Sequence, residues 1–124
     1  MVTKMNNKYK SFYQYMGKMF GSRVIEKQTN DRIYDDNDKD WYMVIEDDKV
    51  QAFVSVNSKN VIKNLYTVKK EYLSEILRYI RMERNIAPSV VTNIYVDLYK
   101  RSGFKIEEEE KLKNFVIVSY QKEA

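Results

Sequence analysis

The chain has 124 residues, 44% of them hydrophobic, and a formal net charge of +4 at pH 7, which predicts one domain over residues 1–124 and only a mild bias toward anionic partners. It contains no cysteine and no histidine, which excludes disulfides, thiolate nucleophiles and the commonest metal ligands, so we expect no metal site. No apolar run approaches the roughly 18 to 20 residues that span a bilayer, and no secretory signal follows Met1, so we expect a cytoplasmic protein without membrane contact.

The first predicted element is a helix over residues 8–20. Its sequence, KYKSFYQYMGKMF, places five apolar side chains at helical spacing: Tyr9, Phe12, Tyr13, Met16 and Phe20. Gly21 and Ser22 come next and predict the end of this helix. Residues 29–40, TNDRIYDDNDKD, are polar and rich in turn-forming residues, so we expect a loop there.

Three β-strands are predicted in the following stretch, WYMVIEDDKVQAFVSVNSKNVIKNLYTV. The first two occupy residues 41–46 and 50–56 and are joined by the short polar connection at 47–49, which is typical of a hairpin. A turn at residues 57–60 leads into the third strand, residues 61–68. The three strands are expected to form an antiparallel meander.

Helical spacing returns over residues 69–85. The apolar positions that share one face are Tyr72, Leu73, Ile76, Leu77 and Ile80. Pro88 predicts the end of this region, because the residue before a proline avoids the helical conformation. A short strand over residues 89–92 precedes a second short helix, which begins near Asn93. Its apolar face is predicted to contain Ile94, Tyr95, Leu98 and Tyr99.

Gly103 lies just past this second helix, where a glycine adopts a positive φ at little steric cost. Two last strands are predicted over residues 104–108 and 115–120, joined by the charged turn EEKLKN. The order of elements predicts an α+β fold. Its sheet is mixed, mainly antiparallel and flanked by helices, and one helix precedes it at the N-terminus.

A short motif surrounds the second helix: Asn93 is followed by LYKRSGF at residues 98–104. This pattern resembles the last helix and following strand of the GNAT acetyltransferase superfamily, which commonly read as asparagine, Leu-Tyr, two or three polar residues and Gly-Phe. The hairpin that starts at Trp41 is similar to the family's second and third strands. NLYTVKKEY, residues 64–72, is similar to its fourth strand and the exit from it. The resemblance covers about residues 40–120 and implies a GNAT-like fold.

The resemblance also implies site residues. Tyr99 matches the tyrosine that, in many family members, protonates the departing CoA thiolate, and an ordinary phenol pKa of about 10 suits a proton donor at neutral pH. Val68, Lys69 and Lys70 lie where the family binds acetyl-CoA, at the exit from its fourth strand. In this chain the two lysines would attract phosphate as point charges.

Two features depart from the family. Its glycine-rich turn presents backbone N–H groups to the CoA pyrophosphate, but this chain has no glycine between Gly21 and Gly103. Its general base is often a carboxylate on the fourth strand, but no Asp or Glu lies between Asp48 and Glu71, which leaves Glu46 and Glu71 as substitutes. The first interpretation is therefore a degenerate GNAT-fold protein without a cofactor, which acts by binding or regulating another protein.

Two alternatives stay open. The first is an acetyl-CoA-dependent N-acetyltransferase of an amine or a protein lysine that uses Tyr99. The second is a nucleic-acid-binding accessory protein that uses the arginines of the long helix, Arg78, Arg81 and Arg84. The acidic run at residues 107–110 opposes binding of a polyanion. The richness in Lys, Asn, Ile and Tyr is typical of AT-rich coding, as found in phages, viruses and low-GC bacteria, and we expect a phage or viral source among these.

Overall fold

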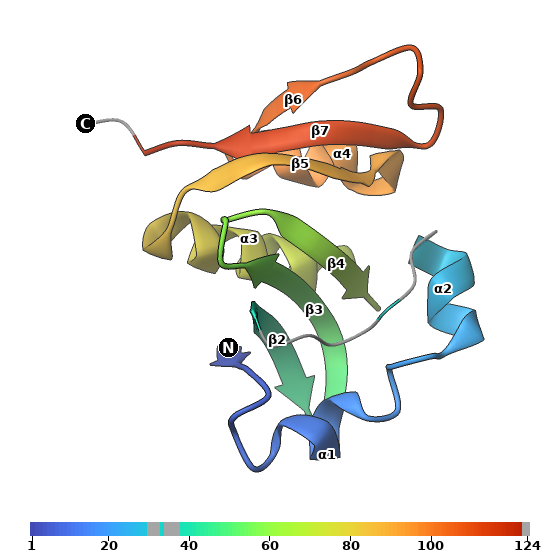
Figure 1. Cartoon of the computed structure of the whole chain (residues 1–124), viewed down its shortest axis with the longest axis vertical. Helices are drawn as coiled ribbons and strands as arrows, with labels where there is room; N and C mark the ends of the chain where they lie inside the picture. Colours follow the sequence, from blue (N-terminus) through green and yellow to red (C-terminus); the bar gives the residue numbers. More distant parts are fainter. Residues whose placement is uncertain (30–32, 34–37, 123–124) are drawn as a thin grey trace.

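The computed structural model describes residues 1–29, 33 and 38–122 (Figure 1). The elements follow one another as β1 (Val2–Met5), α1 (Phe12–Met16), α2 (Arg23–Thr29), β2 (Lys39–Glu46), β3 (Lys49–Asn57), β4 (Ile62–Thr67), α3 (Lys70–Glu83), β5 (Ile86–Thr92), the 3-10 helix η1 (Asn93–Tyr95), α4 (Val96–Arg101), β6 (Lys105–Glu107) and β7 (Phe115–Tyr120). Figure 1 shows β5, β7 and β6 grouped at one end of the molecule and β2, β3 and β4 nearer the other.

The strands form two antiparallel sheets, ordered β1-β2-β3-β4 and β5-β7-β6. The predicted meander is confirmed: β2 pairs with β3, and β3 pairs with β4. The hairpin between β2 and β3 turns at Asp47 and Asp48, whose φ angles are 51° and 60°. Two consecutive positive φ angles match the right-handed twist of the flanking strands, and aspartate tolerates this conformation better than most side chains.

The two sheets meet where β4 and β5 begin. The N–H of Ala87 donates to the carbonyl of Asn60 at 2.8 Å, and the N–H of Ile62 donates to Oγ of Ser89 at 2.9 Å. These contacts advance in the same direction along both strands, so β4 and β5 start side by side and parallel, joined by the crossover helix α3. Farther along, the described residues form no backbone ladder between the two strands, which end in separate sheets.

Alternation along the strands divides the apolar side chains of the first sheet between its two faces. One face carries Tyr42, Val54 and Leu65 and packs against helix α3. The buried side chains of that helix are Leu73, Ile76, Leu77 and Ile80, as the spacing predicts. The opposite face, which includes Trp41 and Phe53, packs against Phe12 and Met16 of α1 in a second cluster. Burying one large apolar side chain contributes roughly 1.5 to 3 kcal/mol, so both clusters stabilise the sheet.

The helix predicted over residues 8–20 is wrong in length, because the structure confines α1 to Phe12–Met16. Gly17, a weak helix former, follows directly. Phe12 and Met16 are fully buried, whereas Tyr9 and Tyr13 are 53% and 54% exposed. Phe20 lies beyond the end of α1 but still packs against Trp41, with ring centroids 5.6 Å apart, so the stripe reaches the core without forming one continuous helix.

Two elements at the N-terminal end were not predicted. Strand β1 pairs antiparallel with β2 at the sheet edge, and its four residues are too few to show a period. Helix α2 covers Arg23–Thr29, just before the predicted loop. Most of that loop lies outside the described residues.

The boundaries around Pro88 also differ from the prediction. Helix α3 ends at Glu83, and Arg84 is already extended. Strand β5 starts at Ile86, earlier than residue 89, and contains Pro88. The pairing of β5 with β7 is irregular between Ile86 and Ser89, which accommodates a residue that lacks an N–H group. The last strands are confirmed, although β6 is shorter than predicted, at Lys105–Glu107.

Gly103→Val is expected to lower the free energy of unfolding by about 2 kcal/mol. The φ angle of Gly103 is +90°, as the sequence predicts in sign, and a β-branched residue is strained there. A Cβ atom would also lie 3.0 Å from Nη1 of Arg81, which donates to the carbonyl of Ser102 at 2.9 Å. Chemical denaturation measures the change. Gly103→Asn is the control, because Asn tolerates positive φ but meets Arg81 in the same way; equal losses in both variants would contradict the backbone argument.

Candidate active site

A cleft of about 340 Å³ lies where β4 and β5 have diverged, near the end of β4. Its lining residues are Tyr66, Thr67, Val68, Ile94 and Tyr95. They come from β4, from the link to α3 and from η1, so the opening between the two sheets supplies the space. The sequence predicted Ile94 to be buried, but it is 54% exposed. Ile94 belongs to the cleft because η1 precedes α4 and turns this side chain away from the core.

Tyr99 lies next to this cleft but does not line it. The side chain is fully buried and packs edge-to-face against Phe104, with ring centroids 5.5 Å apart. Its hydroxyl has no hydrogen-bond partner among the described residues. Burial raises the pKa of the phenol well above its usual range, and the neighbouring Tyr95 raises this pKa further. The group is therefore protonated at every physiological pH, and while it stays buried it is a weaker acid than an ordinary phenol.

Tyr95 connects Tyr99 to the cleft. It is half-buried at the junction of η1 and α4, four residues before Tyr99. Burial raises the pKa of Tyr95, and nearby Tyr66 raises that pKa further. Phenols from β4, the η1–α4 junction and α4 thus form one cluster. The sequence analysis named Tyr95 only as an apolar position of the second helix. Its spacing of four residues from Tyr99 could have indicated that the two tyrosines share one face.

The predicted cofactor-binding residues lie together between β4 and α3. The link between the two elements consists of Val68 and Lys69, and α3 begins at Lys70. The N–H of Val68 already donates to the carbonyl of Gln51 at 2.9 Å, so this amide is not available to a ligand. Lys69 precedes the helix without capping it through its side chain. The first N–H groups of a helix lack intrahelical acceptors, so this end favours an anion.

The two carboxylates that the sequence left as general bases lie at the same end of α3. Glu46 accepts a hydrogen bond from the hydroxyl of Tyr72 at 2.8 Å. Glu71 is in the first turn of α3 and is exposed. Neither lines the cleft, and the described residues that do line it include no carboxylate. We therefore assign neither Glu46 nor Glu71 as the general base.

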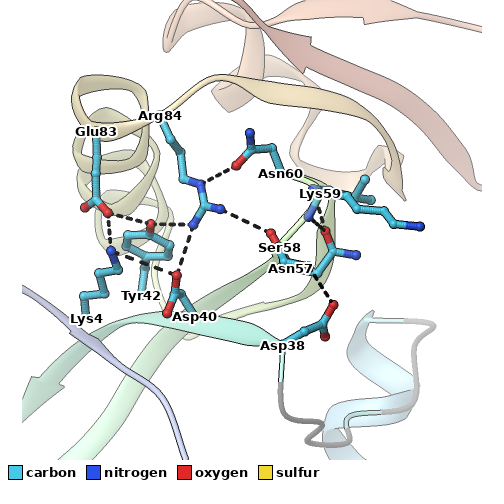
Figure 2. A network of polar contacts seen from close by, with 11 residues as sticks. Lys4, Asp38, Asp40, Tyr42, Asn57, Ser58, Lys59, Asn60, Glu83 and Arg84 are labelled. Carbon is cyan, nitrogen blue, oxygen red and sulfur yellow. Dashed lines mark hydrogen bonds and ion pairs between the residues drawn. The ribbon is translucent and has the colours of Figure 1, made fainter.

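Figure 2 shows Arg84 at the centre of a polar network at the opposite end of α3. Its guanidinium donates to four groups: Oδ1 of Asn60 at 2.8 Å, the hydroxyl of Tyr42 at 3.1 Å, the carbonyl of Asn57 at 3.2 Å and Oδ2 of Asp40 at 3.3 Å. The hydroxyl of Tyr42 donates in turn to Oε1 of Glu83 at 3.2 Å, and Lys4 pairs with Glu83. The network joins β1, β2, the turn before β4 and α3.

The three arginines proposed for nucleic acid therefore do not form one free surface. Arg84 holds the network, and Arg81 donates to the carbonyl of Ser102 at 2.9 Å. Arg78 is exposed on α3. Arg81 also lines a larger hollow of about 830 Å³ near the start of β5, together with Lys59 and Lys105. Nucleic-acid binding stays a prediction.

Within the described residues no helix is both long and apolar enough to cross a membrane. Nor does that part of the chain place three His, Cys, Asp or Glu side chains so that they could hold a metal ion.

No protein-family model and no curated protein matches the sequence. Solved structures do match. The Campylobacter jejuni N-acetyltransferase PseH in complex with acetyl coenzyme A is 15% identical with a TM-score of 0.55, and the match covers 99% of this chain and 100% of that one. A further crystal structure of PseH gives a TM-score of 0.54 at 15% identity, and the match covers 98% of this chain and 99% of that one. An N-acetyltransferase from Staphylococcus aureus Mu50 is 14% identical with a TM-score of 0.60, covering 97% and 94%.

At these identities the matches establish the fold alone. They extend over nearly the whole chain, including the N-terminal elements for which the sequence motifs give no signal. The predicted α+β architecture, with antiparallel sheets flanked by helices, is confirmed. The chain has the fold of the GNAT N-acetyltransferases.

Proposed function

We propose that this protein is an acetyl-CoA-dependent N-acetyltransferase that acts on an amine. The observation that carries the proposal is the hydroxyl of Tyr99, which is buried without a partner beside the cleft between β4 and β5. Leaving a buried hydroxyl unpaired costs about 1 to 3 kcal/mol. An unpaired buried group of this kind calls for an explanation, and a catalytic role fits a hydroxyl beside a cleft.

Acetyl-CoA fits the chain in part. When bound it supplies an acetyl group activated as a thioester. Lys69 and Lys70, at the uncapped start of α3, would attract its phosphates. The glycine turn is absent and the amide of Val68 is taken, so fewer backbone donors remain for the pyrophosphate. We therefore expect a weaker complex than a glycine turn would give.

The chain's own residues divide the work. Tyr99 holds a proton at its hydroxyl oxygen for the departing thiolate, and transfer of that proton requires that the bound ligand relieve the burial that raises the phenol's pKa. Tyr66 and Tyr95 line the cleft with aromatic rings and help to exclude water. With no carboxylate among the described lining residues, we assign removal of the acceptor's proton to solvent.

Acetyl-CoA at about 1 mM is expected to stabilise the protein. A dissociation constant between about 100 μM and 1 mM corresponds to a gain of roughly 0.4 to 1.4 kcal/mol, or a rise of roughly 1 to 6 °C in the melting temperature. Thermal denaturation with and without the ligand measures it. Replacing both Lys69 and Lys70 by Ala should reduce the shift. An unchanged melting temperature, or an equal shift with ATP, would count against a specific site.

A second candidate is a non-catalytic GNAT-fold protein that binds or regulates another protein. It is favoured by the direct passage from β4 into α3 through Val68 and Lys69, with no glycine to admit a pyrophosphate. The two candidates differ in acetyl-CoA chemistry. Release of free thiol from acetyl-CoA in the presence of a panel of amines supports the enzyme. No release, together with unchanged biological activity of Tyr99→Phe, supports the regulatory protein.

A further inference from the structure

The hydroxyl of Tyr99 and the cleft are close but separated. Tyr99 is fully buried and is not part of the cleft lining, whereas Tyr95 lines the cleft and is half-buried. We propose that Tyr95 is a gating residue, whose ring closes the passage between the cleft and the Tyr99 hydroxyl and moves aside when the acyl donor enters. The proposal rests on the proposed function, because the gate controls access to the proton donor assigned there.

The position of Tyr95 in the chain supports this role. It precedes the first residue of α4 and lies four residues before Tyr99. Residues four apart occupy one face of a helix, and helical side chains lean toward the N-terminus. The side chain of Tyr99 therefore leans toward the turn that carries Tyr95.

The causes of the pKa shifts of Tyr95 and Tyr99 indicate which phenols lie near one another. The pKa of Tyr99 is raised by burial first and by Tyr95 next. The pKa of Tyr95 is raised by burial first and by Tyr66 next. Tyr66 lines the cleft from β4. Tyr95 is thus near both other phenols, and it lines the cleft together with Tyr66 whereas Tyr99 does not.

Tyr95 lies where the backbone changes from the 3-10 turn to helix α4. Its φ and ψ are −108° and 23°, outside the helical values of α4. The preceding residues are held: the N–H of Asn93 donates to the carbonyl of Asn114 at 3.0 Å, and the N–H of Ile94 donates to Oγ1 of Thr92 at 3.4 Å. Tyr95 sits at the first position after this anchored turn. The proposed motion is a change of side-chain rotamer at Tyr95, with the preceding turn fixed.

The test is the chemical accessibility of Tyr99 in the full chain. Tetranitromethane nitrates tyrosine rings that solvent reaches, and mass spectrometry of peptides locates the product. A minor open state populated at 10% or less limits the rate, so Tyr95→Ala should raise nitration of Tyr99 by at least about tenfold. Tyr95→Leu, which keeps an apolar side chain, should raise it less. Tyr95→Phe keeps the ring and should leave Tyr99 as protected as in the wild type.

Ile94→Ala is the matched control, because Ile94 lines the same cleft but lies on the preceding turn. Protection of Tyr99 in both folded variants, Tyr95→Ala and Tyr95→Leu, would overturn the gate. So would equal exposure of Tyr99 in Ile94→Ala. Near-ultraviolet circular dichroism establishes that each variant is folded, and if Tyr95→Ala is not, Tyr95→Leu decides alone.

The same experiment separates failure of the gate from failure of the proposed function. If wild-type protein neither binds acetyl-CoA nor releases thiol from it, the enzyme proposal fails. The nitration pattern still decides whether Tyr95 covers Tyr99. If acetyl-CoA binds and is turned over, but nitration of Tyr99 is the same in the wild type, Tyr95→Ala and Tyr95→Leu, only the proposal that Tyr95 is a gate is wrong.

Discussion

Tyr99→Phe is expected to make the protein more stable, by about 1 kcal/mol in the free energy of unfolding. The substitution removes a hydroxyl that is fully buried and has no partner among the described residues. The ring stays and keeps its edge-to-face contact with Phe104. Denaturant titration of both proteins measures the difference. Tyr9→Phe, at an exposed position, is the control and should change nothing.

The same substitution should slow acetyl transfer. General acid catalysis contributes a factor on the order of 10² to 10⁴, so we expect kcat to fall at least on the order of a hundredfold, with little change in the KM for acetyl-CoA. Steady-state kinetics checks both constants. A variant that is less stable would indicate a hidden partner for the hydroxyl. A variant that is fully active would remove Tyr99 from the chemistry and favour the regulatory candidate.

Alkaline pH provides a further readout of the same variant. The folded-state pKa of Tyr99 lies above its unfolded value of about 10. Above that pH the unfolded chain releases the phenolic proton while the folded chain keeps it, so the contribution of Tyr99 to stability falls as pH rises. Below pH 10 the contribution is fully present. Tyr99→Phe lacks this loss, so its stability advantage over the wild type should grow above pH 10.

Arg84→Ala is expected to destabilise the protein by about 3 kcal/mol, near the lower end of values for breaking a buried ion pair. The side chains of Arg84 and Asp40 are 17% and 32% exposed, which reduces the effect below that of a fully buried pair. The variant leaves Asn60 and the carbonyl of Asn57 without their charged donor and removes the nearer cation from Asp40, which keeps Lys4 at 4.0 Å (Figure 2). The melting temperature should fall by roughly 10 °C.

Two further variants test whether the network is the cause. Arg84→Lys keeps the charge but loses the planar fork that reaches four acceptors, so an intermediate loss is expected. Arg78→Ala, on an exposed site of the same helix, should lie within about 0.5 kcal/mol of the wild type. If Arg84→Ala were as stable as Arg78→Ala, the network would contribute nothing measurable.

The sequence by itself determined the elements whose signal is local. Alternation over β2, β3 and β4 and the apolar face of α3 both report which side chains are buried, because a strand or helix must turn one face inward. The turn at Gly103 and the burial of Leu98 and Tyr99 followed in the same way. Val68, Lys69, Lys70 and Tyr99 were named as site residues from the family resemblance; Val68 lines the cleft, and the roles of all four stay predictions.

The tertiary structure alone decided the features that depend on residues far apart in the chain. Strand β1 exists because β2 offers an edge, and Phe20 packs on Trp41 of β2 although α1 ends at Met16. The cleft exists because β4 and β5 pair only where they begin, and that divergence brings Tyr66 next to Tyr95. A local sequence pattern cannot predict such a contact, because it indicates whether a side chain is buried and not which distant residue it packs against.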